Sequence, residues 1–244
     1  MGRVLAFLYG VVCYAVFFAT FLYSIGFVEG LVVPKAIDTG AAGPLVPTLV
    51  IDAALLGVFA IQHSLMARPV FKAWWTKIVP APVERSTYVL FASLALVLLF
   101  WQWRPLPQTI WALQGSAATA VLAVSFAGWL IVLTSTFLIN HFDLFGLRQV
   151  HAYATGKEVP PHEFTTPLFY RVVRHPIYLG FIVAFWAAPT MSVGHLVFAG
   201  ATTAYILIAT QLEEHDLVGV FGDTYRAYKR RVSMILPWVP SGKA

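Results

Sequence analysis

The sequence predicts an all-α, polytopic membrane protein. Of its 244 residues, 59% are hydrophobic and only 11% are charged, whereas soluble domains carry about 25% charged residues. The apolar residues also gather in runs of about 20, the length that a helix needs to cross the ~30 Å hydrocarbon core of a bilayer. A lipid bilayer is therefore the expected surroundings of most of the chain.

Four of these runs each predict one transmembrane helix: Val4–Val28, Val46–Met66, Ser86–Trp103 and Ala117–Ile139. The first run exceeds the ~7–15-residue core of a cleaved signal peptide, so we expect it to be retained. A fifth apolar region, from Ile177 to Leu212, is too long for one span.

A turn divides the fifth region. Pro189 cannot continue a helix undisturbed, and Ser192 is a suitable N-cap for a new one. We therefore expect a C-terminal helical hairpin made of Ile177–Ala188 and Val193–Leu212. At ~1.5 Å per residue its first helix is too short to cross alone, so that helix should begin below the membrane surface.

The distribution of basic residues predicts the orientation, because cytoplasmic loops are enriched in Lys and Arg. With a cytoplasmic N-terminus, only Lys35 and Arg104 fall outside. The residues on the inner side are then Arg3, Arg68, Lys72, Lys77, Arg85, Arg148, Lys157, Arg171, Arg174, Arg226, Lys229, Arg230, Arg231 and Lys243. Both termini are cytoplasmic in this topology. Residues 1–244 form a single membrane domain, with transmembrane helices in 1–139 and the catalytic part, including short cytoplasmic helices, in 140–244.

Three kinds of site are not expected. The net charge of +5 belongs to the loops, and no basic face interleaved with aromatics points to nucleic acid. Cys13 is the only cysteine, so neither a disulfide nor a cysteine-ligated metal cluster is expected. It lies within the first apolar run, which suits a small buried side chain. His151 and His162 are far apart in an irregular segment, and no His, Asp and Glu set has metal-ligand spacing, so we expect no metal.

The segment "YRVVRHPIYLG", Tyr170–Gly180, carries charge at the entrance of the hairpin. The preceding Thr166–Pro167 pair predicts a short helix, with the threonine as N-cap and the proline at the first position. His175 precedes a proline and ends that helix. Pro176 then opens the next helix, whose first three N–H groups, together with Arg174, suit a carboxylate or phosphate. The alternative is an ordinary membrane-entry helix with interfacial Arg and Tyr side chains.

The tail begins with two acids, Glu213 and Glu214, where we expect the last membrane helix to end. Carboxylates at a helix C-terminus oppose the macrodipole. We therefore expect a cation or hydroxyl partner for this pair.

A short helix is predicted after the acids, capped by Asp223. It carries Tyr225 and Tyr228 on one face and Arg226 and Arg230 on a neighbouring stripe. For the basic residues, the alternative is an amphipathic helix lying on anionic lipid.

Together these segments bring anion-binding groups, carboxylates and the rings of Tyr178, Tyr225 and Tyr228 to one cytoplasmic pocket. S-adenosylmethionine requires all three kinds of group, since it has a carboxylate, an ammonium, a ribose diol and a sulfonium. A sulfonium is attracted to aromatic faces. No G-x-G-x-x-G follows a strand, which disfavours a Rossmann-type site.

The paired motifs "RHPIYLG" and "LEE…FGDTYRAYKRRV" resemble those of the isoprenylcysteine carboxyl methyltransferase family of integral-membrane methyltransferases, over residues 164–237. More narrowly, "NHFDLFGLRQV" at Asn140–Val150 is similar to the bacterial methanethiol S-methyltransferases. The resemblance implies that S-adenosylmethionine binds between the hairpin and the C-terminal helix. The residues that fall on cofactor-binding motifs are Arg174, His175, Pro176, Tyr178, Leu179, Gly180, Glu213, Glu214, Tyr225 and Tyr228.

The segment "INHFDLFGLRQ" follows the fourth span and is the candidate acceptor side. The thiolate is the nucleophilic form of a thiol, and alkyl thiols are mostly protonated at neutral pH. We expect His141 to take the proton, Asp143 to orient His141, and Arg148 to stabilise the thiolate, all near the cofactor. The alternative is a helix end with Asn140 as C-cap and Arg148 on lipid phosphate.

Two further histidines have simpler explanations. His63 lies within a span, where an ionisable residue is either functional or hydrogen-bonded, here to Gln62 or Ser64. His195 lies near the hairpin turn and is expected to be structural.

The predicted function is methyl transfer from S-adenosylmethionine to a small thiol, methanethiol above all, in a bacterial inner membrane. Three alternatives stay open. They are a lipid or prenylated thiol or carboxylate as acceptor, an NADPH-dependent membrane reductase, and a non-enzymatic membrane assembly factor of the NnrU type.

Overall fold

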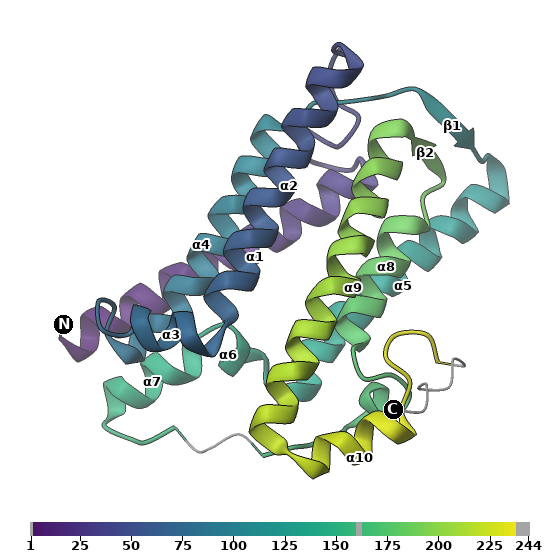
Figure 1. Cartoon of the computed structure of the whole chain (residues 1–244). Coiled ribbons are helices and arrows are strands. Elements are labelled where there is room, and N and C mark those ends of the chain that lie inside the picture. The colour runs from purple at the N-terminus through teal and green to yellow at the C-terminus, as the bar shows by residue number, and fades with distance from the viewer. Residues whose placement is uncertain (1, 160–162, 238–244) are drawn as a thin grey trace. The chain divides into compact units, whose positions relative to one another are not determined.

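The computed structural model describes residues 2–159 and 163–237, which form a helical protein with one small two-stranded sheet (Figure 1). The elements are α1 (Arg3–Glu29), α2 (Leu45–Ala67), α3 (Pro69–Trp75), α4 (Ala81–Gln102), β1 (Thr109–Ala112), α5 (Gly115–Ile139), α6 (His141–Leu144), α7 (Leu147–Thr155), η1 (Leu168–Arg171), α8 (Pro176–Trp186), β2 (Thr190–Ser192), α9 (Val193–Phe221) and α10 (Asp223–Arg231). His162 and Lys243, named above, lie outside the described residues.

Five of the helices, α1, α2, α4, α5 and α9, are long and apolar enough to cross a membrane. Many of their large apolar side chains are exposed, including those of Val4 (69%), Ile61 (67%) and Leu130 (63%). Such exposure costs about 25 cal/mol per Å² in water. In the hydrocarbon core of a bilayer the same side chains contact lipid chains, and this cost does not arise. The prediction of an all-α, polytopic membrane protein is confirmed.

The chain folds into two compact units. The first unit contains α1 to α4, α6 and α7, and in it α1 packs against α4 and α7. Gly10 on α1 meets Val150 on α7 so closely that an added Cβ would lie 2.5 Å from a methyl carbon of that valine. Ala6, Val83 and Val150 form a buried core at this crossing.

The second unit contains α5, η1, α8, α10 and α9 from Leu196 onward. In this unit α5 packs closely against α8. A Cβ added at Gly180 would lie 2.7 Å from the carbonyl oxygen of Gly128, and one added at Gly128 would lie 2.6 Å from the backbone nitrogen of Ala184. Neither position has room for a side chain. The hydroxyl of Ser125 also donates to the carbonyl of Ala184 at 2.8 Å.

The expected hairpin is present, with α8 and α9 side by side (Figure 1). The rings of Phe185 and Phe198 meet edge to face at 5.1 Å, and the indole of Trp186 donates to the hydroxyl of Thr203 at 2.9 Å. The prediction that Ser192 caps α9 is also confirmed, because its hydroxyl accepts the backbone N–H of His195 at 3.0 Å.

The prediction of a short helix with Thr166 as its N-cap is wrong in the extent of the helix. The structure has a single 3₁₀ turn, Leu168–Arg171, with Pro167 at the N-cap position. The turn cannot extend because Val173 leaves the helical path to form a parallel bridge with Ser233.

The end of α9 also differs from the prediction, since the helix continues beyond Leu212 to Phe221. Gly222, with a φ of 56° that favours glycine, ends it and takes the N-cap position of α10. The prediction of Asp223 as the cap is therefore wrong. Asp223 occupies the first helical position and pairs with Arg226 at 2.8 Å.

Candidate active site

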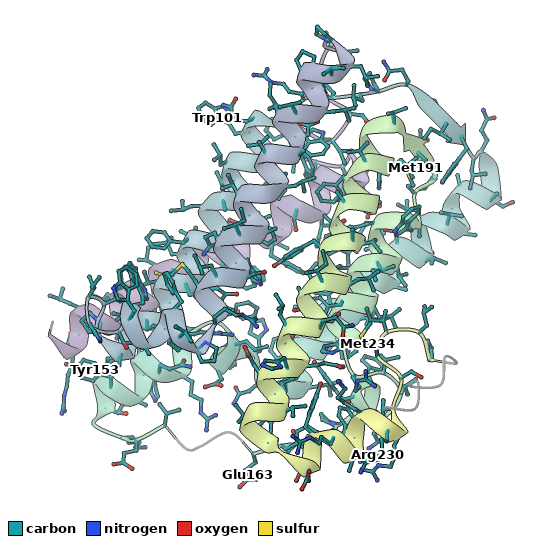
Figure 2. All side chains as sticks on the ribbon, in the orientation of Figure 1. Trp101, Tyr153, Glu163, Met191, Arg230 and Met234 are labelled. Carbon is teal, nitrogen blue, oxygen red and sulfur yellow. The ribbon has the colours of Figure 1, made fainter. Side chains whose placement is uncertain are left out.

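The predicted cofactor residues of the second unit meet around the N-terminus of α8. As expected, His175 has a non-helical backbone (φ −125°, ψ 66°) and Pro176 is the first residue of α8. Figure 2 shows the side chains of this end of the unit, with Arg230 on α10 and Met234 on the segment that follows. We call residues Arg174–Tyr178 the α8 corner.

Glu214 lies at the centre of a buried ionic cluster. Its side chain is 2% exposed, and its Oε1 atom is 2.5 Å from Nε of Arg174 and 3.1 Å from Nε2 of His175. Its Oε2 atom is 2.8 Å from Nζ of Lys229. A buried carboxylate is stable only when it is paired and hydrogen-bonded, and these three side chains meet that requirement. The expected partners of the acidic pair therefore exist, although Glu214 needs them because it is buried, not because a helix ends there.

Arg174 ties the α8 corner to α10 and the segment after it. Its guanidinium donates to the backbone carbonyls of Lys229, at 3.0 Å, and Val232. Its backbone N–H donates to Ser233 at 2.8 Å, and that of His175 to Met234 at 3.1 Å. The guanidinium predicted to hold an anionic ligand is thus engaged with protein groups.

The prediction of three N–H groups in the first turn of α8 is wrong by one. Proline has no N–H, so the groups at this helix N-terminus belong to Ile177 and Tyr178. The positive end of the helix dipole still lies here, which keeps the α8 corner suited to an anion.

Glu213 has a different environment from Glu214. Its side chain is 40% exposed, and its Oε2 atom accepts a hydrogen bond from the hydroxyl of Tyr178 at 2.9 Å. The same oxygen lies 3.9 Å from Nδ1 of His175. Glu213 is therefore the carboxylate of the pair that a ligand can reach.

Tyr225 and Tyr228 lie on one buried face of α10, as predicted, with 2% and 4% exposed. The hydroxyl of Tyr228 donates to the carbonyl of Tyr170. Burial raises the pKa of both phenols, that of Tyr228 to about 12 despite the opposing charge of Arg174. Both side chains are therefore neutral hydroxyls at physiological pH. Arg226 and Arg230 are exposed on the same helix, again as predicted.

The remaining motif residues shape α8. Gly180 allows the contact with α5 described above, and the backbone N–H of Leu179 makes the first hydrogen bond of the helix, to His175, at 3.1 Å. Pro176 is fully buried at the helix start. Packing and backbone geometry account for the glycine and the proline, whereas the hydrogen bond of Leu179 involves only its backbone.

The predicted acceptor-side residues all lie in the first unit. His141, on α6, is 4% exposed, and its Nε2 atom is 2.8 Å from the hydroxyl of Tyr14 on α1. Burial lowers the pKa of His141, which favours the neutral imidazole that a base requires. Asp143 is 6% exposed and lies 3.8 Å from Nη1 of Arg148. Asn140 is the C-cap of α5, as expected from the alternative interpretation of this segment as a helix end.

His63 makes an interhelical hydrogen bond, but its partner differs from the two residues that were expected. The hydroxyl of Tyr88 on α4 lies 3.0 Å from Nδ1 of His63 on α2. His195, buried at 4% exposure in the first turn of α9, fits the structural interpretation.

Sequence reasoning missed Lys229 and Tyr14 as members of these clusters. Lys229 is four residues after Tyr225, so helical spacing places it next to the buried face of α10; that signal was available. Tyr14 is paired with a residue 127 positions away, and no local pattern indicates the pairing.

Comparison with known proteins tests the resemblance drawn from the motifs. The chain is 60% identical over 237 residues to methanethiol S-methyltransferase 1 of Bradyrhizobium diazoefficiens, covering 97% of this chain and 83% of that protein. It is 53% identical over 240 residues to the methanethiol S-methyltransferase of Crocosphaera subtropica (98% of this chain, 94% of that protein). For that of Mycobacterium tuberculosis the identity is 54% over 239 residues (98% of each). No solved structure matches.

A family model supports the same relationship. The model described as NnrU protein matches residues 52–234, a range that contains the α8 corner, the acidic pair, His141 and α10. The resemblance inferred from the motifs is confirmed, and the chain belongs to the NnrU protein family.

Proposed function

We propose that this chain is an S-adenosylmethionine-dependent S-methyltransferase that converts methanethiol into dimethyl sulfide. The observation that carries the proposal is the 53–60% identity to proteins named methanethiol S-methyltransferase, over 97–98% of this chain. The similarity extends over nearly the whole chain, so it is not confined to one cofactor motif. The excess of Lys and Arg in alternate loops supports a bacterial cytoplasmic membrane with both termini inside.

The α8 corner and Glu213 are the proposed cofactor-binding surface. S-adenosylmethionine, when bound, supplies an electrophilic methyl group. Its carboxylate is suited to the N–H groups of Ile177 and Tyr178 at the positive end of α8. Glu213, which is 40% exposed, is suited to accept hydrogen bonds from the ribose diol or the ammonium group. The ring of Tyr178 offers a face for the sulfonium.

The buried residues of this region hold that surface in position. Arg174, His175, Glu214 and Lys229 fix α10 against α9 and the α8 corner. The rings of Tyr225 and Tyr228 close the buried side of α10. Methyl transfer by direct displacement depends chiefly on alignment of the reacting atoms and exclusion of water, and a rigid support serves both.

On the acceptor side, we assign His141 as the base. The thiol S–H bond breaks, the proton moves to the imidazole, and the sulfur lone pair forms the new bond to the methyl carbon. At the same time the bond between that methyl carbon and the sulfonium sulfur of the donor breaks, and its electron pair stays on the donor sulfur, which becomes a neutral thioether. Asp143 and Arg148 are the proposed groups that compensate the charge developing during this step.

A headspace assay tests the proposal. Purified protein in detergent receives methyl-labelled S-adenosylmethionine and methanethiol, and labelled dimethyl sulfide is measured. We expect product from the wild type and a reduced affinity for the methyl donor in Glu213→Gln. Glu163→Gln is the matched control, because Glu163 is an exposed glutamate of the same unit; it should behave as the wild type.

The outcomes separate this proposal from its alternatives. Donor binding without volatile product would redirect the function to a lipid or prenylated acceptor. Absence of donor binding, with NADPH protecting the protein from unfolding, would indicate a reductase. Binding of neither would leave the non-enzymatic alternative.

A further inference from the structure

The ring of His141 contacts three aromatic rings, those of Tyr14, Phe142 and Phe145, and Phe17 packs against the last of these. We call these four aromatic residues the His141 aromatic cluster. The imidazole meets Phe145 at a centroid distance of 4.8 Å, Phe142 at 5.4 Å and Tyr14 at 5.7 Å, each time edge to face. Phe17 stacks on Phe145 at 3.7 Å. These contacts cover most of the imidazole, since only 4% of His141 is exposed, and they restrict rotation of the ring.

Within this apolar enclosure, the hydroxyl of Tyr14 gives the imidazole a polar contact at a specific atom. The oxygen lies 2.8 Å from Nε2, and it connects the transmembrane helix α1 to α6, immediately after α5. Tyr14 is half-buried, and a tyrosine hydroxyl that is removed from water generally requires a hydrogen-bond partner. In a histidine, the hydrogen bond made by one ring nitrogen sets the role of the other nitrogen.

We propose that Tyr14 is a positioning residue for His141, whose hydroxyl holds Nε2 and so assigns Nδ1 as the atom that takes the proton of the acceptor thiol. The inference rests on the proposed function and adds to it a residue that none of the sequence motifs contains. Tyr14 acts through His141 and touches no reacting atom.

The proton inventory of this arrangement is balanced. Before the reaction, Nε2–H donates to the hydroxyl oxygen of Tyr14, and Nδ1 carries the lone pair. When the thiol S–H bond breaks, its proton binds Nδ1, and the imidazolium that forms still donates through Nε2 to Tyr14. After methyl transfer, that proton leaves Nδ1 for solvent. The tyrosine therefore stabilises the charged form of the base without losing its own proton.

Several titratable groups lie around the cluster. Asp143 and Arg148 follow on α6 and α7 as a pair 3.8 Å apart. On α4, Arg85 donates from Nε to the carbonyl of Leu144 at 2.8 Å. Burial lowers the pKa of His141, so the base is neutral at physiological pH. The hydrogen bond that Nε2–H donates to Tyr14 stabilises the imidazolium and therefore acts in the opposite direction.

The test compares Tyr14→Phe with Tyr9→Phe. Tyr9 lies on the same helix and makes an interhelical hydrogen bond of the same kind, with its hydroxyl 3.0 Å from Oγ1 of Thr87. Both variants lose one hydroxyl from α1, but only the first one touches His141. For Tyr14→Phe we expect kcat to fall roughly tenfold with unchanged KM for the methyl donor. Tyr9→Phe should keep the wild-type kcat.

The pH dependence of kcat distinguishes positioning from a purely structural role. Loss of the group that accepts Nε2–H destabilises the imidazolium, so the pKa of His141 falls. The rising limb of the kcat profile in Tyr14→Phe should then shift to lower pH, by up to about one unit. An unshifted limb, or equal losses of kcat in the two variants, would overturn the inference.

NMR of protein with ¹⁵N-labelled imidazole rings gives a readout that does not depend on turnover. In the wild type we expect His141 to be neutral with the proton on Nε2, and in Tyr14→Phe we expect that tautomer preference to weaken. If the wild type forms no dimethyl sulfide but the tautomer preference is still weaker in Tyr14→Phe than in the wild type, the proposed function fails and the positioning by Tyr14 stands. If tautomer populations are the same in both proteins, the inference fails whatever the activity.

Discussion

Glu213 and Glu214 are neighbours on α9, yet 40% of the Glu213 side chain is exposed and only 2% of the Glu214 side chain. Consecutive residues on a helix point about 100° apart. Glu214 therefore faces Arg174 and Lys229, while Glu213 faces Tyr178 and the surface. We infer that one carboxylate stabilises the fold and that the other contacts the ligand.

Glu214→Gln is expected to destabilise the protein strongly. The substitution removes the negative charge that compensates Arg174 and Lys229, and breaking a buried ion pair costs about 3–5 kcal/mol. Glutamine retains one acceptor oxygen, so we expect a value near the lower end, and a fall of roughly 10 °C in the unfolding midpoint. Tryptophan fluorescence during heating in detergent measures it.

Glu213→Gln is the matched control on the neighbouring residue. A side chain this exposed contributes at most about 1 kcal/mol through its charge, so the unfolding midpoint should stay within a few degrees of the wild type. Its effect should appear instead in the affinity for the methyl donor. Equal losses of stability in the two variants would contradict the division of roles.

Gly180→Ala is expected to weaken the packing of α8 against α5. The new Cβ would lie 2.7 Å from the carbonyl oxygen of Gly128 and 2.9 Å from the backbone nitrogen of Val132, and backbone atoms cannot move aside cheaply. Overpacking of this kind costs about 1–3 kcal/mol. Thermal unfolding of the purified variant measures the loss.

Gly200→Ala provides the comparison for this prediction. Gly200 lies on α9, and an added Cβ there meets no atom within 4 Å. Alanine has a helix propensity about 1 kcal/mol better than glycine, so this variant should be as stable as the wild type or more stable. If Gly180→Ala behaved in the same way, close approach of α5 and α8 would not explain the glycine.

Local sequence signals predicted the membrane part of the fold. Apolar runs gave the spans because a helix in lipid needs length and hydrophobicity above all. Pro189 and Ser192 marked the hairpin turn because each has a fixed local consequence, a missing N–H and a capping hydroxyl. These features act within a few residues along the chain, so the sequence alone contained them.

The contacts of the candidate site were less predictable because they join distant segments. The bond between Arg174 and Glu214 spans 40 residues, and that between Tyr14 and His141 spans 127. The motifs indicated that a carboxylate pair and an arginine belonged to one region. They did not indicate that Glu214 would be buried by Arg174 and Lys229, because the sequence does not show where α10 docks.

Alkaline pH is expected to destabilise the docking of α10. Burial raises the pKa of Tyr228 to about 12, whereas an unfolded tyrosine titrates near 10. The native state holds this proton more tightly, so the stabilisation is fully present below about pH 10. It is lost as the pH rises through the folded value near 12. Unfolding midpoints measured between about pH 8 and about pH 12 should therefore fall above pH 10, together with phenolate absorbance.

Tyr228→Phe separates the ionisation from the hydrogen bond to the carbonyl of Tyr170. The variant loses that bond, so its stability at neutral pH should be about 1 kcal/mol lower. Because it has no proton to release at this position, its stability should decline less steeply than that of the wild type above pH 10. The two slopes should differ by up to about 1.4 kcal/mol per pH unit. Tyr153→Phe, on α7 in the other unit, should keep the wild-type slope. If the slope of Tyr228→Phe matched that of the wild type, the alkaline loss would have to arise from another group.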